Sequence, residues 1–148
     1  MKTMITGHRL YKLQSYDIDW IKNAIEEAFY STFLEYTSYG LTGMASGVDL
    51  WFAEYLLANK MPYASYVPFE GQETTMDAES AELRERLMKT AANVYAVRNS
   101  KMVEDADWAL VVFDGNKGGT HNVFQQLIEK KKPFVWINPV GKKIWACD

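Results

Sequence analysis

Short apolar runs alternate with segments of helical periodicity along the whole chain, and this alternation limits the fold more than any other feature. The apolar runs predict strands at residues 2–6, 39–42, 63–67, 93–97, 108–113 and 134–137, the last of the chain. The segments between them predict helices at residues 18–33, 48–56, 77–90, 100–105 and 121–130. This alternation is typical of an α/β protein with an open, mainly parallel sheet and helices on both faces.

Two helix starts carry capping signals. Asp17 is placed to cap the first helix, and Ser46 with Asp49 matches the spacing of a capping box at the second. A box of this kind would fix where the second helix begins.

Length and composition favour a single domain spanning residues 1–148, with a real core. The net charge of −3 argues against nucleic-acid binding, because such surfaces are usually basic. The single cysteine allows no disulfide within the chain, which suits a cytoplasmic protein. The sequence shows no apolar run of membrane-spanning length and no His/Cys pair at metal-ligand spacing. We therefore expect no membrane contact, no metal and no cofactor.

The chemically unusual residues follow the predicted strands. They fall in TGHR at 6–9, TGMASGVD at 42–49, PFEGQE at 68–73, RN at 98–99 and DGNKGGT at 114–120. Ligands of open parallel sheets bind beyond the carboxyl ends of the strands, where these loops meet. The sequence therefore predicts one binding site at this edge of the sheet.

Glycines mark the starts of two predicted helices at that edge. Gly43 and Gly47 bracket one start, and Gly118 with Gly119 leads into the other. Glycine lets backbone N–H groups approach a ligand, and a helix N-terminus favours an anion. The spacing matches neither the dinucleotide fingerprint nor a P-loop. These turns indicate phosphate binding; the alternative is that each glycine only permits a tight turn.

Charged and polar side chains of the same loops complete the predicted site. Arg9 and Arg98 offer forks of donors suited to phosphate, although a surface arginine often pairs with a carboxylate instead. Asp49 could accept a hydrogen bond from a ribose hydroxyl, or it could serve only in the capping box. His8 could contact an anion, or it could only form hydrogen bonds with nearby backbone groups. Gln72 and Glu73 are further candidate polar contacts. The predicted ligand-binding residues are Thr6, Gly7, His8, Arg9, Gly43, Ser46, Gly47, Asp49, Glu70, Arg98, Asn99, Asp114, Gly115, Gly118, Gly119, Thr120 and Asn122.

TGHR, GMASGVDLWFAE, PFEGQE, RNSKMVEDAD and FDGNKGGTHN occur in this order over nearly the whole chain. In these motifs the chain resembles the YpsA-like branch of the SLOG superfamily, which also includes the LOG phosphoribohydrolases and the DprA Rossmann-like domain. The resemblance implies a Rossmann-like fold, a pocket for a nucleotide or nucleotide-derived ligand, and a bacterial or phage source. Since the phosphoribohydrolases form dimers, it also implies a homo-oligomer.

The resemblance carries over to binding residues better than to catalytic ones. Arg98 matches the arginine that precedes a P-G-G-x-G-T-x-x-E motif in the phosphoribohydrolases, and residues 118–120 match its phosphate-binding turn. The catalytic glutamate of that motif is Val123 here, and its first proline is absent. The nucleoside deoxyribosyltransferases have a related turn, and against them the same glutamate is missing. This pattern implies that binding is kept and that the known catalytic group is lost.

Three functions remain open at this point. The first is a protein that senses or sequesters a nucleotide-like small molecule. The second is a hydrolase or transferase acting on N-glycosidic bonds, with Asp49, Glu70 or Glu73 supplying the missing carboxylate. The third is a protein-interaction module whose pocket is vestigial.

Overall fold

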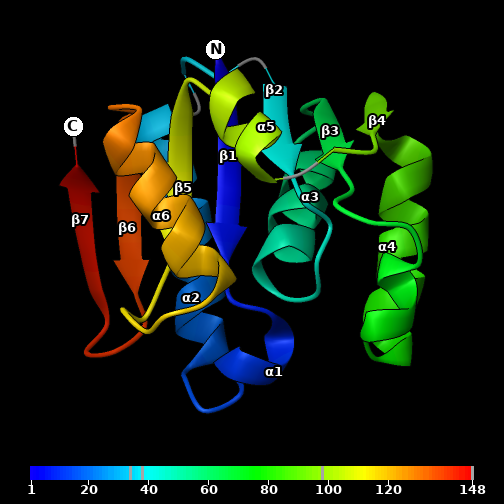
Figure 1. The fold of residues 1–148 in the computed structure, drawn as a ribbon, viewed down its shortest axis with the longest axis horizontal. Helices are drawn as coiled ribbons and strands as arrows, with labels where there is room; N and C mark the ends of the chain where they lie inside the picture. The colour runs from blue at the N-terminus through cyan, green and yellow to red at the C-terminus, as the bar shows by residue number, and fades with distance from the viewer. Residues whose placement is uncertain (34, 38, 98, 148) are drawn as a thin grey trace.

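The computed structural model describes residues 1–33, 35–37, 39–97 and 99–147. The elements in chain order are β1 (Lys2–Gly7), α1 (Leu10–Leu13), α2 (Ile18–Ala28), a π-helical turn (Phe29–Phe33), β2 (Tyr39–Thr42), α3 (Val48–Ala58), β3 (Tyr63–Tyr66), a 3₁₀ turn (Gln72–Thr75), α4 (Ala78–Thr90), β4 (Asn93–Tyr95), α5 (Asn99–Asp105), β5 (Trp108–Val112), α6 (Gly119–Glu129), β6 (Phe134–Asn138) and β7 (Lys143–Cys147). The strands form one sheet in the order β4-β3-β2-β1-β5-β6-β7 (Figure 1).

The predicted α/β fold with a mainly parallel sheet is confirmed. Strands β1 to β6 pair in parallel, and β7 pairs antiparallel with β6. The chain runs outward from β1 in both directions, toward β4 on one side and toward β6 on the other. This reversal of strand order is the type of position at which open parallel sheets bind ligands.

Helices cover both faces of the sheet (Figure 1). On one face α2 and α3 bury an apolar cluster that includes Ile25, Phe52 and Leu56. On the other face α5 and α6 bury a second cluster, which includes Met102 and Val123. As a result α3, which follows β2, and α6, which follows β5, lie on opposite faces.

The structure corrects two predictions about the elements and adds one helix. Phe134–Asn138 is not the last strand, because β7 follows it and pairs with it in antiparallel register. The Trp136 and Trp145 rings, which face each other in this pairing, have centroids 4.7 Å apart. The helix predicted over residues 18–33 is α-helical only to Ala28 and then widens into a π-helical turn. The short helix α1, which lies just beyond the end of β1 in Figure 1, was not predicted.

The turn before α3 packs directly on the turn after β1. Gly47, with φ of 87°, is the N-cap of α3, and a Cβ on it would lie 2.8 Å from the Leu10 nitrogen and 3.2 Å from the His8 oxygen. Ser46 Oγ accepts a hydrogen bond from Leu10 N–H at 3.4 Å instead of capping α3. The predicted capping box is therefore wrong, because Gly47 occupies the cap and Ser46 joins the two turns.

The contact at Gly47 gives a prediction about stability. Gly47→Ala should lower the free energy of unfolding by more than about 3 kcal/mol, because it adds a backbone clash to the strain of a positive φ. Gly115→Ala is the matched control: Gly115 also has a positive φ, 92°, but a Cβ there meets nothing within 4 Å. The control should lose only about 1 kcal/mol. Urea denaturation measures both, and equal losses would contradict the importance of this contact.

Candidate functional site

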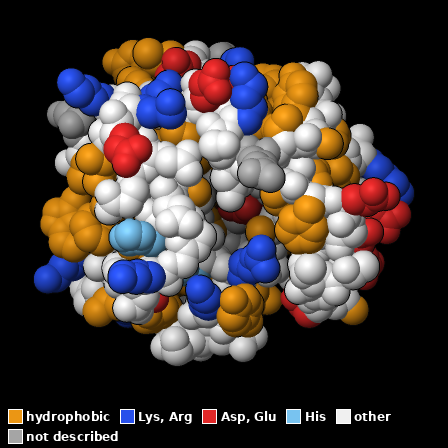
Figure 2. Space-filling view, viewed as in Figure 1, with side chains coloured by type: hydrophobic (Ala, Val, Ile, Leu, Met, Phe, Trp, Pro, Cys, Tyr) orange, Lys and Arg blue, Asp and Glu red, His pale blue; other side chains and the backbone are white. Residues whose placement is uncertain are grey.

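A cavity of about 190 Å³ opens at the carboxyl ends of β1, β2 and β3 and at the starts of α5 and α6. Figure 2 shows a hollow near the middle of this face, with basic side chains along its lower edge. The residues that line the cavity are Thr6, Gly7, His8, Arg9, Tyr11, Lys12, Gly43, Ala45, Asp49, Pro68, Gln72, Asn99, Met102, Gly119 and Thr120. They come from loops far apart in the sequence, which the parallel sheet gathers at one edge.

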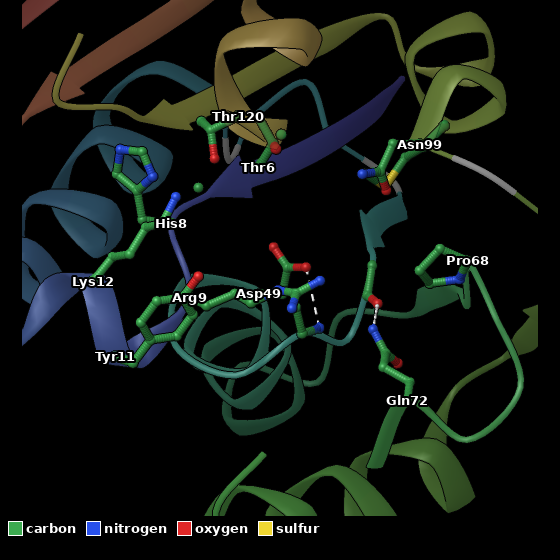
Figure 3. A pocket seen from close by; sticks show the side chains of 15 residues that line it. Thr6, His8, Arg9, Tyr11, Lys12, Asp49, Pro68, Gln72, Asn99 and Thr120 are labelled. Atoms are coloured by element: carbon green, nitrogen blue, oxygen red, sulfur yellow. Dashed lines mark hydrogen bonds between the residues drawn. The ribbon is translucent and has the colours of Figure 1, made fainter. Parts of the chain in front are cut away.

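Most of the predicted site residues meet at this cavity. Those that line it are Thr6, Gly7, His8, Arg9, Gly43, Asp49, Asn99, Gly119 and Thr120. In Figure 3, Thr6 and Thr120 lie on one side of the cavity, Asn99 on another, and Asp49 near its centre. The loops that follow β1, β2 and β5 therefore share one site, as do the residues at the start of α5.

The other predicted residues do not line the cavity. Ser46, Gly47, Asp114 and Gly118 lie in the turns that support it. Glu70, Gly115 and Asn122 are exposed and lie outside its lining. Arg98 lies outside the residues that the structure describes.

Several lining residues were not among the predicted binding residues. Tyr11 and Lys12 belong to α1, whose four residues are too few to show helical periodicity. Gln72 was only a candidate polar contact, and it alone of Glu70, Gln72 and Glu73 lines the cavity. The signal that could have indicated Lys12 is its position three residues after Arg9, which was already predicted to bind an anion.

Two basic side chains line the cavity without a carboxylate partner. Within the part of the chain that the structure describes, neither Arg9 nor Lys12 forms an ion pair. The Lys12 ammonium lies beside the turn before α6, since a Cβ on Gly118 would be 3.3 Å from Lys12 Nζ. The cavity thus carries positive charge that the described carboxylates do not neutralise by contact.

Two helices begin at the cavity, and neither has a side-chain cap. The N-caps of α3 and α6 are Gly47 and Gly118, which have no side chain to accept from the first N–H groups. Both helices have eleven residues, long enough to develop a dipole. Backbone donors near Gly119 and Thr120 therefore add to the positive potential of the cavity.

Asp49 places one acid within this basic surrounding. Its Oδ2 accepts a hydrogen bond from Ala45 N–H at 3.2 Å. Burial raises the pKa of the Asp49 carboxyl to about 7, although the Ala45 N–H and the Arg9 guanidinium both favour the ionised form. At neutral pH this carboxyl can therefore either accept or donate a hydrogen bond toward the cavity.

His8 is engaged by the loop after β5. Its Nε2 lies 3.1 Å from the Asp114 amide nitrogen, which donates to it, and 2.9 Å from Asp114 Oδ1. Asp114 Oδ2 also accepts from the Tyr16 hydroxyl at 2.9 Å. Burial lowers the pKa of His8 despite the neighbouring Asp114 carboxylate. A neutral ring is held through the amide and a protonated ring through the carboxylate, so His8 joins two loops in either state.

The described residues form neither a cluster of metal ligands nor a membrane-spanning helix. Among them, no group of three or more His, Cys, Asp or Glu side chains could hold a metal ion. None of the helices described is both long enough and apolar enough to cross a membrane.

Val123, at the position of the phosphoribohydrolase glutamate, is 2% exposed and packs in the core cluster with Met102 and Leu127.

The raised pKa of Asp49 predicts a pH dependence of stability. The folded state holds a proton on Asp49 that the unfolded state has lost between pH 3.8 and about 7, so stability should fall as pH rises through this window. Asp49→Asn keeps an acceptor for Ala45 N–H but cannot ionise. It should raise the melting temperature at pH 8 by at least about 2 °C and change it little at pH 4.

Differential scanning calorimetry at both pH values measures this effect. Asp19→Asn, which removes an exposed carboxylate from α2, is the control and should not show the same pH dependence. An equal shift at pH 4 and pH 8 for Asp49→Asn would contradict the prediction.

The comparisons with known proteins agree with the resemblance seen in the motifs. No curated protein matches the chain. The sequence model of the YspA SLOG family, YpsA, matches residues 3–135, from β1 into β6. The matched region includes every residue that lines the cavity. This chain therefore belongs to the YspA SLOG family.

Proposed function

We propose that this protein binds a nucleotide or a phosphorylated nucleotide derivative in the cavity at the end of β1, as a sensor or sequestering protein. One observation carries the proposal: Arg9 and Lys12, without ion-pair partners among the described residues, meet the uncapped starts of α3 and α6. Such a combination favours a phosphate over a neutral ligand. Membership of the SLOG family supports the same class of ligand.

The phosphate fits best between Lys12 and the start of α6. The ammonium there lies next to the Gly118 turn, and Gly119 and Thr120 line the cavity beside it. Backbone N–H groups and a lysine are a common pair of phosphate donors. Arg9, the N-cap of the short helix α1 that carries Lys12, adds a second cation on the Asp49 side.

The size of the cavity limits the rest of the ligand. At about 190 Å³ it is smaller than the roughly 300–1,000 Å³ typical of drug-sized sites. A phosphate and its sugar would fill it, with Asp49 and Asn99 as partners for sugar hydroxyls. The base would then lie at the rim, where Tyr11 lines the opening and is 66% exposed. An exposed aromatic ring at that place suits stacking on a base.

The two cations give the main test. Arg9→Ala and Lys12→Ala should each weaken nucleotide binding by about 10–100-fold, because each removes a charged donor. Isothermal titration calorimetry with a panel of nucleoside mono- and diphosphates measures the affinities. A ligand at a hundred times its dissociation constant should also stabilise the wild type by about 2.7 kcal/mol.

Lys130→Ala is the matched control, since Lys130 is exposed and lies at the far end of α6. It should bind like the wild type. A wild type that binds no member of the panel would contradict the proposal and favour the alternative of an interaction module.

A second candidate function is cleavage of an N-glycosidic bond, and the position of Asp49 favours it. Of the three carboxylates that could replace the missing glutamate, only Asp49 lines the cavity. Burial brings the pKa of Asp49 to about 7, close to the value that suits an acid or base at neutral pH. Water would add to the sugar carbon that bears the base, and the bond from this carbon to the base nitrogen would break. The base would leave with a proton from the water.

Product analysis separates the two candidates. Chromatography after incubation with each nucleotide should reveal free base and sugar phosphate if the protein is an enzyme. Asp49→Asn should then lower the rate by at least about 100-fold, in line with the loss of a general acid or base. If both the wild type and the variant bind nucleotides and form no product, the cleavage function is contradicted and binding is the remaining candidate.

A further inference from the structure

The buried amide of Gln72 connects the cavity to a helix outside it. Gln72 is 2% exposed and lines the cavity. Its Nε2 donates to the Gly43 carbonyl oxygen at 2.9 Å, a bond drawn in Figure 3. Its Oε1 accepts from Arg84 Nε at 3.0 Å. The chain of contacts therefore runs from α4 through the 3₁₀ turn to the turn after β2.

Arg84 determines which way the Gln72 amide faces. An arginine Nε–H can only donate, so the amide must turn its oxygen toward Arg84 and its NH₂ toward Gly43. The Arg84 side chain is 12% exposed, and its Nη1 lies 3.7 Å from Glu73 Oε2. Arg84 is thus held in place on α4 without lining the cavity itself.

The Gly43 peptide at the other end of this chain lies against Asp49. A Cβ on Gly43 would be 2.9 Å from Asp49 Oδ2 and 3.6 Å from Asn99 Oδ1. A change in the plane of this peptide would therefore move atoms against two of the polar groups expected to meet a sugar. The bond from Gln72 holds the carbonyl oxygen in one direction and so fixes this wall of the cavity.

We propose that Arg84 is a positioning residue, which sets the shape of the binding site by orienting Gln72 and, through it, the Gly43 peptide. This inference goes beyond the proposed function but rests on it for its effect on a ligand. It assigns to α4, whose arginine lies outside the cavity, a role in the affinity of the site.

A double-mutant cycle tests whether Arg84 acts through Gln72. Arg84→Met and Gln72→Met keep the aliphatic stems and remove the polar contacts. Each should weaken the binding of adenosine 5′-monophosphate by about five- to tenfold, the effect of one hydrogen bond. The double variant should bind no more weakly than Gln72→Met alone, because the two residues act in series. Additive losses would overturn the proposal.

Two further variants guard against a general loss of structure. Arg86→Met removes the same charge from the exposed side of α4 and should bind like the wild type. Gln72→Glu keeps the acceptor for Arg84 but turns an oxygen toward the Gly43 carbonyl, and it should bind as weakly as Gln72→Met. If Gln72→Glu binds like the wild type, the Gly43 contact is irrelevant and the proposal fails.

A spectroscopic readout without ligand separates this proposal from the proposed function. The Met44 N–H belongs to the peptide whose carbonyl oxygen Gln72 bonds. Arg84→Met should shift the ¹⁵N resonances of the Met44 amide and of the Gln72 side chain, and Arg86→Met should leave both unchanged. Unchanged signals in Arg84→Met would overturn the proposal even if nucleotides bind. Failure of the wild type to bind any nucleotide would contradict the proposed function instead.

Discussion

The position of β1 between β2 and β5 determines where this protein can hold a ligand. The chain leaves β1 toward β2 on one side and returns on the other side as β5, so α3 and α6 lie on opposite faces of the sheet. Their N-termini then meet beyond the end of β1, where no strand continues. A concave site with converging helix starts follows from the strand order alone, before any particular side chain is considered.

Side chains of opposite charge line the cavity at the end of β1. Arg9 and Lys12 bring positive charge, and Asp49 lies among them with its ionisation suppressed by burial. An ion pair with Arg9 would have neutralised both groups, but the described residues form none there. Among the described residues, no carboxylate therefore neutralises Arg9 or Lys12 by contact.

The sequence alone was sufficient for the fold class, since β1 to β6 lie at the predicted strand positions and α3, α4 and α6 at predicted helix positions. Strand β7 was not predicted. Its residues Ile144 and Trp145 are 47% and 39% exposed, so the strand is held by pairing with β6 rather than by burial. In the site, the glycine turns and Arg9 could be predicted because chemistry and strand ends coincide. Lys12 and Tyr11 could not, since their positions depend on the short helix α1. Gly47 was predicted as a ligand contact but does not line the cavity, and a Cβ on it would meet the backbone of the turn after β1.

The link from His8 to Asp114 and from Asp114 to Tyr16 has a consequence for the kinetics of any association. It fastens the loop after β1 to the loop after β5 through contacts within the protein itself. A rigid receptor of this kind loses little conformational entropy on capture. The rate of encounter would then be governed by diffusion and by electrostatic attraction to Arg9 and Lys12, with no slow closing step.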